Sequence, residues 1–392
     1  MATSPANTTY AVQVVELDRA DRFAALRDTV ASELLSLGLH RTLRVNVTDA
    51  PVPAAQPGVV VYLGSPSAAS APTVDRHIAT ALASGLVVIP VVDDPAAIPA
   101  QLPQSLAPIN AFTWQGQLAP QRLARLLLEE LGIEDKQRQL FISHKRDDGL
   151  GAAEQLHDRL SRERFLPFID RFAITPGAPV QEVIADALED RAFLLLLETP
   201  LAHKSPWVFD ELDYALSHTM GTLILQWPNN PTPVPGSAGL PRELLAPDDL
   251  LEDDHRYQIL TPAALERVVA LVEAAHAHGL VRRRRMLVTS IQEAALAAGC
   301  RCLPTQSWRL VVQQGAHSTL VGVTPRLPTA TDLQYLDDAR NQIDPTTSAV
   351  LVHSARYLRE LRRAHLTWVT GNRDLTLVPE NAIGARWNAH GT

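Results

Sequence analysis

The chain is poor in cysteine and has no long uninterrupted apolar segment. Its 392 residues contain two cysteines, Cys300 and Cys302, so a disulfide framework is excluded. No second Cys pair or nearby His cluster completes a zinc site, and a structural role is expected for both thiols. No apolar run approaches the roughly 18–20 residues of a membrane span. The first residues lack the positively charged and then apolar segments, in that order, of a signal peptide. These absences predict a cytoplasmic protein without a metal site or a membrane anchor.

An excess of positive charge is also absent. The 35 basic and 43 acidic residues give a formal net charge of −8, so neither nucleic acid nor an anionic membrane is expected as a partner. With 46% hydrophobic and 20% charged residues, the composition is that of a globular protein. At about 100–200 residues per domain, the length predicts two or three domains.

Predicted strands and helices alternate through the first two thirds of the chain. Within residues 1–135 we expect strands at 10–15, 43–47, 58–64, 86–92 and 111–114, and helices at 22–39, 72–84 and 120–131. Within residues 136–280 we expect strands at 139–143, 165–169, 192–197 and 222–226, and helices at 151–162, 180–188, 206–216 and 262–276. Such alternation predicts two α/β domains, each with a parallel sheet covered by helices on both sides.

The last part of the chain, residues 281–392, predicts a third domain of α/β or α+β class. Its opening run Arg282–Arg285 is typical of a solvated helix surface or a linker. We expect helices at 291–298, 331–342 and 356–365, and strands at 308–312, 318–323, 349–353, 367–370 and 375–379. No catalytic constellation is evident in this domain.

The predicted helix at 206–216 carries the most informative side chains. Ser205 suits the helix N-cap, and Pro206 suits the first helical position, where its missing N–H costs nothing. Trp207 and Glu211 are four residues apart, so they lie on one side of the helix, beside its apolar face. The apolar face consists of Val208, Leu212, Ala215 and Leu216. A carboxylate at the lip of a core, next to a flat ring, suits a polar ligand; the plain alternative is a solvated Glu and a packing Trp.

An internal repeat links the first two predicted domains. Residues 59–82 align without gaps on 193–216, with seven identities in 24 positions at a constant offset of 134. Shared prolines at a fixed offset favour a duplication. Opposite Trp207 stands Thr73, and opposite Glu211 stands His77. The first copy therefore lacks the indole–carboxylate pair and is expected to be a regulatory or scaffold copy.

Short motifs in residues 136–279 resemble a bacterial Toll/interleukin-1-receptor (TIR) domain. They are Leu140-Phe141-Ile142-Ser143-His144, Phe168-Ile169-Asp170, Pro176-Gly177, and Ser205-Pro206-Trp207 followed by Glu211-Leu212. The first domain is similar only to a degenerate TIR-like fold. The resemblance implies a five-stranded, flavodoxin-like parallel sheet, and hence tandem TIR-like units followed by the C-terminal domain.

The resemblance also implies one of two functions. Some TIR domains are homotypic interaction modules, whereas many cleave NAD, release nicotinamide and leave ADP-ribose or a cyclised form. In the cleaving members the carboxylate of the Trp-x-x-x-Glu helix is catalytic, which is Glu211 here, and NAD is a substrate and not a cofactor. Ser143 and the loop from Asp170 to Gly177 would border the nicotinamide. His144 departs from the family, where an aromatic such as Tyr is common, and this affects the fine substrate contacts.

The strand ends offer an independent reason to expect a site here. In open parallel sheets ligands bind outside the carboxyl ends of the strands. In this chain Ser143, Asp170 and Thr199 all lie at predicted carboxyl ends. Together with the residues that the resemblance implies, the expected substrate-binding residues are Ser143, Asp170, Arg171, Gly177, Thr199, Ser205 and Trp207. Structural alternatives are a strand-end role for Ser143 and an Asx turn or loop ion pair for Asp170 and Arg171. Glu198 is a candidate second polar group, and His157 is expected at the surface.

Three functions follow as hypotheses. The first is a gated, self-assembling NAD-cleaving effector of antiviral defence or cell suicide, with TIR–TIR contacts that build a homo-oligomer or filament. In this hypothesis the first and third domains assist assembly or bind an activating ligand or protein, and the 170–179 loop is the gate. The second is a non-catalytic TIR scaffold or signalling adaptor. The third is a glycosidase that uses the same carboxylate on another N-riboside.

Overall fold

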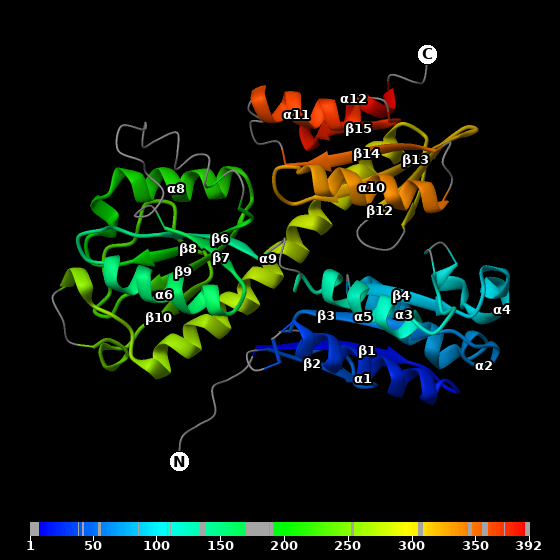
Figure 1. Cartoon of the computed structure of the whole chain (residues 1–392), viewed down its shortest axis with the longest axis horizontal. Coiled ribbons are helices and arrows are strands. Elements are labelled where there is room, and N and C mark those ends of the chain that lie inside the picture. Colours follow the sequence, from blue (N-terminus) through cyan, green and yellow to red (C-terminus); the bar gives the residue numbers. More distant parts are fainter. Residues whose placement is uncertain are drawn as a thin grey trace. The chain divides into compact units, whose positions relative to one another are not determined.

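Three five-stranded sheets organise the described part of the chain (Figure 1). The computed structural model describes all residues except 1–7, 38, 41–42, 54–55, 85, 108, 110, 134–137, 170–187, 189–190, 252–254, 305–308, 344–346, 355–359, 372 and 389–392. The chain divides into two compact units. Unit 1 comprises Met1–Thr8 and Gly132–Arg283, and unit 2 comprises Thr9–Leu131 and Arg284–Thr392.

Unit 1 contains an entirely parallel sheet in the order β10-β9-β8-β6-β7. Its strands are β6 (Gln139–Ser143), β7 (Leu166–Phe168), β8 (Phe193–Glu198), β9 (Gly221–Gln226) and β10 (Arg242–Leu244). Its helices include α6 (Leu150–Arg162), α8 (Pro206–Ser217) and the N-terminal part of α9 (Pro262–Ala297). The predicted α/β fold class is confirmed. The short edge strand β10 was not predicted, because it lies in a proline-rich connection.

Each face of this sheet has its own apolar core. On one face, Phe141 of β6 packs with Leu194 and Leu196 of β8 against α8. On the other face, Leu140 and Ile142 pack against α6 and α9. Because successive side chains of a strand point to opposite faces, the last residue of β6, Ser143, shares the α8 face with Phe141.

Helix α9 is continuous, which corrects two predictions. The expected helices at 262–276 and 291–298 are parts of one helix of 36 residues. No proline interrupts residues 277–290. Gly279 lies where the helix crosses the sheet, and a Cβ at this position would lie 2.9 Å from the Cα of Gly221. The run Arg282–Arg285 is not a fully solvated surface, since Arg283 and Arg284 are buried.

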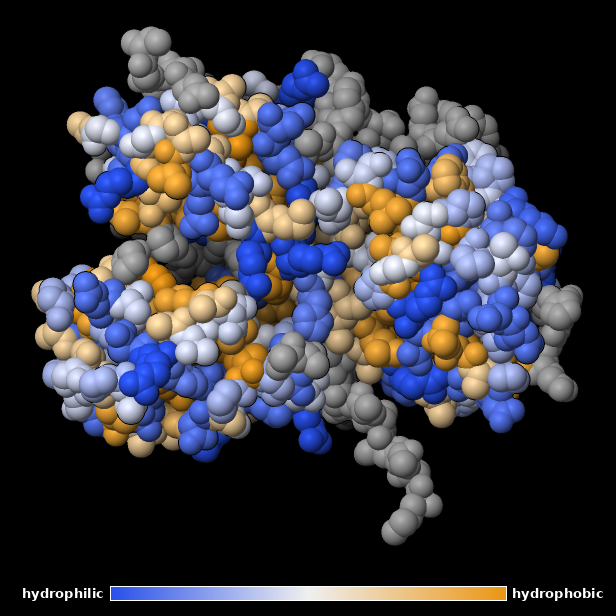
Figure 2. All heavy atoms as spheres, turned by 180° about the vertical axis from the view of Figure 1, so that it is seen from behind, coloured by the Kyte–Doolittle hydropathy of each residue, from blue (hydrophilic) through white to orange (hydrophobic). Residues whose placement is uncertain are grey.

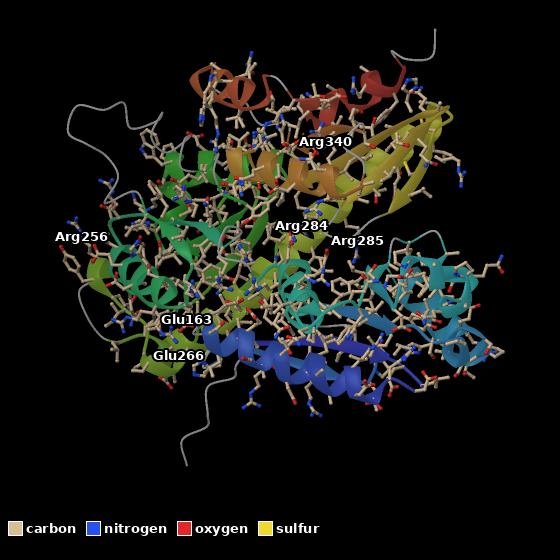
Figure 3. All side chains as sticks on the ribbon, turned by 45° about the vertical axis from the view of Figure 1, so that its right-hand side comes forward. Glu163, Arg256, Glu266, Arg284, Arg285 and Arg340 are labelled. Atoms are coloured by element: carbon tan, nitrogen blue, oxygen red, sulfur yellow. The ribbon has the colours of Figure 1, made fainter. Side chains whose placement is uncertain are left out.

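Ion pairs attach α9 to the rest of unit 1. Arg138, fully buried, donates to both carboxylate oxygens of Glu273 at 2.8 and 2.5 Å, and its guanidinium lies 3.9 Å from the centroid of the Phe165 ring. Arg159 of α6 pairs with Glu163 and with Glu266 of α9 (Figure 3). The Arg138–Glu273 pair is buried and therefore costly to break, so it holds α9 in one register against the sheet.

The first sheet of unit 2 repeats the plan of unit 1. Its order is β2-β1-β3-β4-β5, and the pairings of β1 with β3, β3 with β4, and β4 with β5 are parallel. The strands are β1 (Thr8–Val15), β2 (Leu43–Thr48), β3 (Gly58–Leu63), β4 (Val87–Val92) and β5 (Phe112–Thr113). The longer helices are α1 (Ala20–Ser36), α3 (Pro72–Ala83) and α5 (Ala119–Glu130).

Equivalent strand pairs and hydrogen bonds occur at the sequence offset of 134 between residues 59–82 and 193–216. Val59 pairs with Val87 in this sheet, as Phe193 pairs with Gly221 in unit 1. After the helix that follows, the bond from Leu86 N to Ala81 O (3.0 Å) corresponds to that from Met220 N to Ala215 O (2.9 Å). The similarity therefore extends beyond the aligned residues 59–82 and 193–216 into the next strand.

The second sheet of unit 2 is mixed. Its order is β11-β12-β13-β14-β15, with antiparallel pairs among the first three strands and parallel pairs among the last three. The strands are β11 (Arg301–Pro304), β12 (Arg309–Gln314), β13 (His317–Thr324), β14 (Ser348–His353) and β15 (Leu375–Pro379). The helices are α10 (Ala330–Ile343), α11 (Glu360–Thr370) and the short α12 (Ile383–Asn388).

One prediction for this sheet was wrong, and one strand was not predicted. Residues 367–370 were expected as a strand but form the last turn of α11, because Leu366 is buried and continues the packed face of that helix. The Thr-Trp-Val-Thr composition favours a strand locally, and tertiary packing overrides this preference. Strand β11, which contains Cys302, was missed.

Candidate active site

Helix α8 begins as predicted. The Ser205 hydroxyl accepts a hydrogen bond from Val208 N at 3.4 Å, and Pro206 occupies the first turn. An N-cap hydroxyl satisfies a backbone donor that the helix itself leaves without a partner. Ser205 thus sets the start of α8 and the position of the side chains one turn further on.

Glu211 lies within the buried face of α8, and not beside it as predicted. Its side chain is 5% exposed, and the other buried residues of this helix are Val208, Leu212 and Ala215. Positions 208, 211, 212 and 215 form one helical stripe, so Glu211 is in its middle. Leu216 was assigned to the apolar face, yet it is 37% exposed.

Trp207 occupies a different environment from Glu211. It is 41% exposed, although it precedes Glu211 by one helical turn. The core around α8, and not the indole alone, keeps the carboxylate away from water.

Ser143 lies on the same side of the sheet as Glu211. It is the last residue of β6, is fully buried, and its Oγ has no hydrogen-bond partner among the residues that the structure describes. A buried hydroxyl without a partner is uncommon, because it loses its bonds to water. Glu211 and Ser143 therefore place an acid and a hydroxyl on one face, with the hydroxyl at the carboxyl end of a central strand.

Thr199 has a structural partner that the sequence did not reveal. Its hydroxyl donates to Asp148 Oδ1 at 2.8 Å, and Leu201 N donates to Asp148 Oδ2 at 2.7 Å. Asp148 is 5% exposed and lies just before α6. An acidic residue at this position predicts a helix-capping group. Instead, it joins the loop after β6 to the loop after β8.

The loop after β6 also carries an ion pair at the surface. Lys145 Nζ lies 2.9 Å from Asp147 Oδ2. The hydrogen bond and the positive charge of Lys145 lower the pKa of Asp147. His144 is buried at the start of this loop.

Glu198 is not a polar group of an open cleft. It is fully buried and accepts hydrogen bonds from Val234 N (2.9 Å), Ser237 Oγ (2.8 Å) and Arg242 Nη1 (2.8 Å). Val234 and Ser237 belong to the connection that follows β9, and Arg242 is the first residue of β10. Glu198 thus fixes this connection and the edge strand β10, which corrects its expected role.

The remaining predicted site residues divide into two groups. Asp170, Arg171 and Gly177 lie outside the described residues, as do the proposed gate at 170–179 and most of the helix expected at 180–188. His157 lies at the surface of α6, with Nδ1 3.2 Å from Asp158 Oδ1. It takes no part in the arrangement around α8.

Surveys of the described residues give two further findings. They contain no group of three or more His, Cys, Asp or Glu side chains arranged to hold a metal ion. No helix among them is long and apolar enough to cross a bilayer. On the face shown in Figure 2, hydrophobic patches are interrupted by hydrophilic side chains.

Comparison with known proteins identifies the domain that carries this arrangement. The parallel sheet, with an acidic side chain buried on the following helix, defines an α/β domain of flavodoxin-like architecture. Residues 140–248 match the family described as TIR domain, so a TIR domain is present in this part of the chain. Searches of curated proteins and of solved structures return no match.

Proposed function

We propose that the TIR domain cleaves NAD between nicotinamide and ribose, with Glu211 as the catalytic carboxylate. The observation that supports this most directly is the burial of Glu211, 5% exposed, on the sheet face that it shares with Ser143. A carboxylate away from bulk water interacts more strongly with a nearby cation, because the effective dielectric constant is lower. The rim of a parallel sheet is also where ligands bind in such folds.

The reaction needs one acidic group. As the C–N bond to nicotinamide breaks, its electron pair leaves with the ring nitrogen, and the pyridine departs neutral without a proton. The ribose becomes an oxocarbenium-like cation, which the Glu211 carboxylate stabilises electrostatically. Water then forms the new C–O bond and releases a proton to give ADP-ribose, whereas attack by a group of the same molecule gives a cyclic product. The Ser143 hydroxyl is proposed to contact the substrate.

The remaining parts of the chain are assigned regulatory roles in this proposal. The equivalent registers of the β3–β4 and β8–β9 pairs support a duplication, with a degenerate TIR-like first copy that has His77 in place of Glu211. NAD depletion harms the cell, so the enzyme is proposed to act as a gated antiviral or cell-suicide effector in the cytoplasm. Its trigger would be a ligand or protein that binds residues 1–135 or 281–392.

TIR domains commonly act through homotypic assembly, and α8 offers a surface for it. Trp207, Phe209 and Leu216 are 41%, 43% and 37% exposed on this helix. Large apolar side chains in water favour contacts with another protein surface. In the proposed enzyme these contacts build the active oligomer. The same observation supports the alternative function, a non-catalytic scaffold or adaptor in which Glu211 has no chemical role.

Nicotinamide release from NAD tests the proposal. The full-length protein is incubated with NAD when dilute and when concentrated enough to assemble, and free nicotinamide is measured by chromatography. Glu211→Gln is expected to lower the rate about 10²–10³-fold, the usual effect of removing a group that stabilises transition-state charge. Asp210→Asn is the matched control, because this neighbouring carboxylate of α8 is exposed, and its rate should stay near that of the native protein.

The outcomes separate the hypotheses. Equal rates for the native protein and a folded Glu211→Gln variant would remove Glu211 from catalysis. No nicotinamide release under any assembly condition would favour the scaffold. Release of the base from other N-ribosides, but not from NAD, would indicate a related glycosidase.

A further inference from the structure

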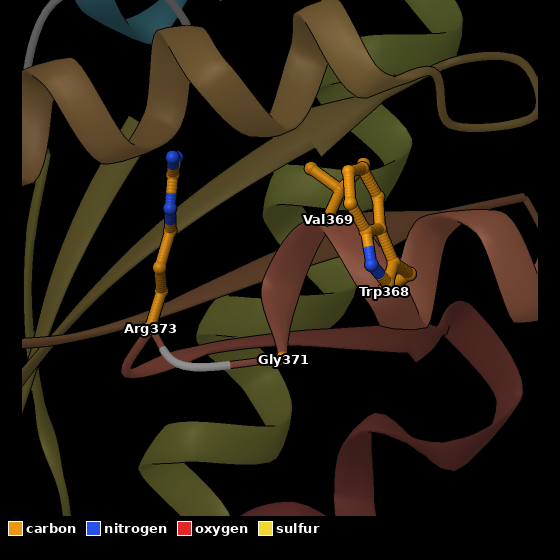
Figure 4. A pocket seen from close by; sticks show the side chains of 4 residues that line it. All are labelled: Trp368, Val369, Gly371 and Arg373. Atoms are coloured by element: carbon orange, nitrogen blue, oxygen red, sulfur yellow. The ribbon is translucent and has the colours of Figure 1, made fainter.

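A cavity of about 450 Å³ lies in unit 2, where α11 ends and the chain turns toward β15 (Figure 4). It is lined by Trp368, Val369, Gly371 and Arg373. Its volume falls in the range of small-molecule sites, roughly 300–1,000 Å³. All four residues are outside the TIR domain at 140–248, and the proposed reaction makes no use of them.

Trp368 supplies a flat apolar surface to this cavity. It is 79% exposed, the highest value among the large hydrophobic side chains that the structure describes. Two residues earlier, Leu366 is buried and holds α11 on the sheet, so Trp368 is not needed for that packing. An exposed indole next to a cavity offers a ring face on which a planar aromatic group can stack.

Arg373 supplies an oriented positive charge. Its Nη1 lies 3.0 Å from Asp337 Oδ2, while the other oxygen of Asp337 lies 2.7 Å from Arg340 Nη2 of α10. Two guanidinium groups share one carboxylate, so these three side chains carry a net charge of +1. Arg373 keeps 49% of its side chain exposed, whereas Asp337 and Arg340 keep 11% and 10%. A guanidinium fixed on one side presents its remaining donors to an oxyanion such as phosphate.

We propose that this cavity binds a nucleotide, with the base stacked on Trp368 and a phosphate held by Arg373. Trp368 lies in the last turn of α11 and Arg373 follows that helix, and their side chains stand apart with a gap between them (Figure 4). A nucleotide carries a planar ring and an anionic group at the two ends of a sugar, which matches this pairing. A nucleoside lacks the anion, and a sugar phosphate lacks the ring, so each is expected to bind more weakly.

Calorimetric titration of the full-length protein with AMP, adenosine and ribose 5-phosphate tests this site. Trp368→Ala should weaken AMP and adenosine alike, by about tenfold, since it removes the stacking surface. Arg373→Gln should weaken AMP and leave adenosine unchanged, because only the phosphate contact is lost. Trp368→Phe keeps a ring, so it should retain AMP binding. The change in tryptophan fluorescence that AMP binding causes in the native protein should be lost in this variant.

Two control variants separate this cavity from other sites. Leu296→Ala removes another highly exposed apolar side chain of unit 2, 76% exposed, and should leave AMP binding unchanged. Glu211→Gln alters the TIR domain and should also leave it unchanged. The proposal does not depend on NAD cleavage. It is overturned if AMP does not bind at millimolar concentration, or if binding survives both Trp368→Ala and Arg373→Gln.

Discussion

Replacing Glu198 by Gln separates a structural carboxylate from the proposed catalytic one. Glu198 and Glu211 are both buried, at 0% and 5% exposure, and both belong to the TIR domain. Glu198 accepts hydrogen bonds from a backbone amide, a hydroxyl and the guanidinium of Arg242. Gln has nearly the same shape, but it is neutral and turns one oxygen into an N–H donor that faces these donors.

The loss of stability can be estimated from these contacts. A hydrogen bond to a charged group contributes about 1.5–3 kcal/mol, and Gln can keep only those that reach its single oxygen. Arg242 keeps 24% of its side chain exposed, so water replaces part of what it loses. We expect unfolding of the domain to require about 2–4 kcal/mol less free energy. At about 2–4 °C per kcal/mol, its melting temperature should fall by roughly 4–16 °C.

Thermal melting and NAD cleavage together provide the assay. Glu198→Gln should lower the melting temperature while the rate per folded molecule, measured well below melting, stays near native, whereas Glu211→Gln should lose the rate. The control is Glu243→Gln, a partly exposed acid paired with Arg267, whose effect should be below about 1 kcal/mol. If Glu198→Gln melted like the native protein but no longer cleaved NAD, Glu198 would contact the substrate and our assignment would be wrong.

Two further predictions concern stability. Burial lowers the pKa of His353, so the folded state binds its proton less readily than the unfolded state. The contribution of His353 to folding stability is then fully present above about pH 6.5, and it is lost as the pH falls below that value. Urea unfolding of His353→Gln between pH 7 and 5 should therefore show a weaker pH dependence, unlike the exposed control His317→Gln. Gly279→Ala should cost about 1–2 kcal/mol, because its Cβ would lie 2.9 Å from the Cα of Gly221, whereas Gly384→Ala meets no atom within 4 Å and should not destabilise α12. An unchanged pH dependence for His353→Gln, or equal melting of the two glycine variants, would contradict these predictions.

Local sequence signals predicted much of the secondary structure. The Ser205-Pro206 pair set the start of α8, because a cap and a first-turn proline act within one helical turn. Apolar runs bounded by turn residues located the strands of the sheets β2-β1-β3-β4-β5 and β10-β9-β8-β6-β7, except for the edge strand β10. The extent of α9 was predicted wrongly, since a glycine and four arginines resemble a linker. Only the close approach of Gly279 to Gly221 shows why glycine is there.

The chemical roles of the acids depended on tertiary structure. A carboxylate at the end of an apolar strand looks the same in the sequence whether it faces a ligand or a loop, and the donors to Glu198 lie 36–44 residues further along the chain. Asp148 likewise meets Thr199 51 residues away. The sequence by itself therefore determined the α/β pattern and the start of α8, because both follow from signals within a few turns. Which acids are buried, and which are already bound by the protein, was decided by contacts between distant segments that no local pattern encodes.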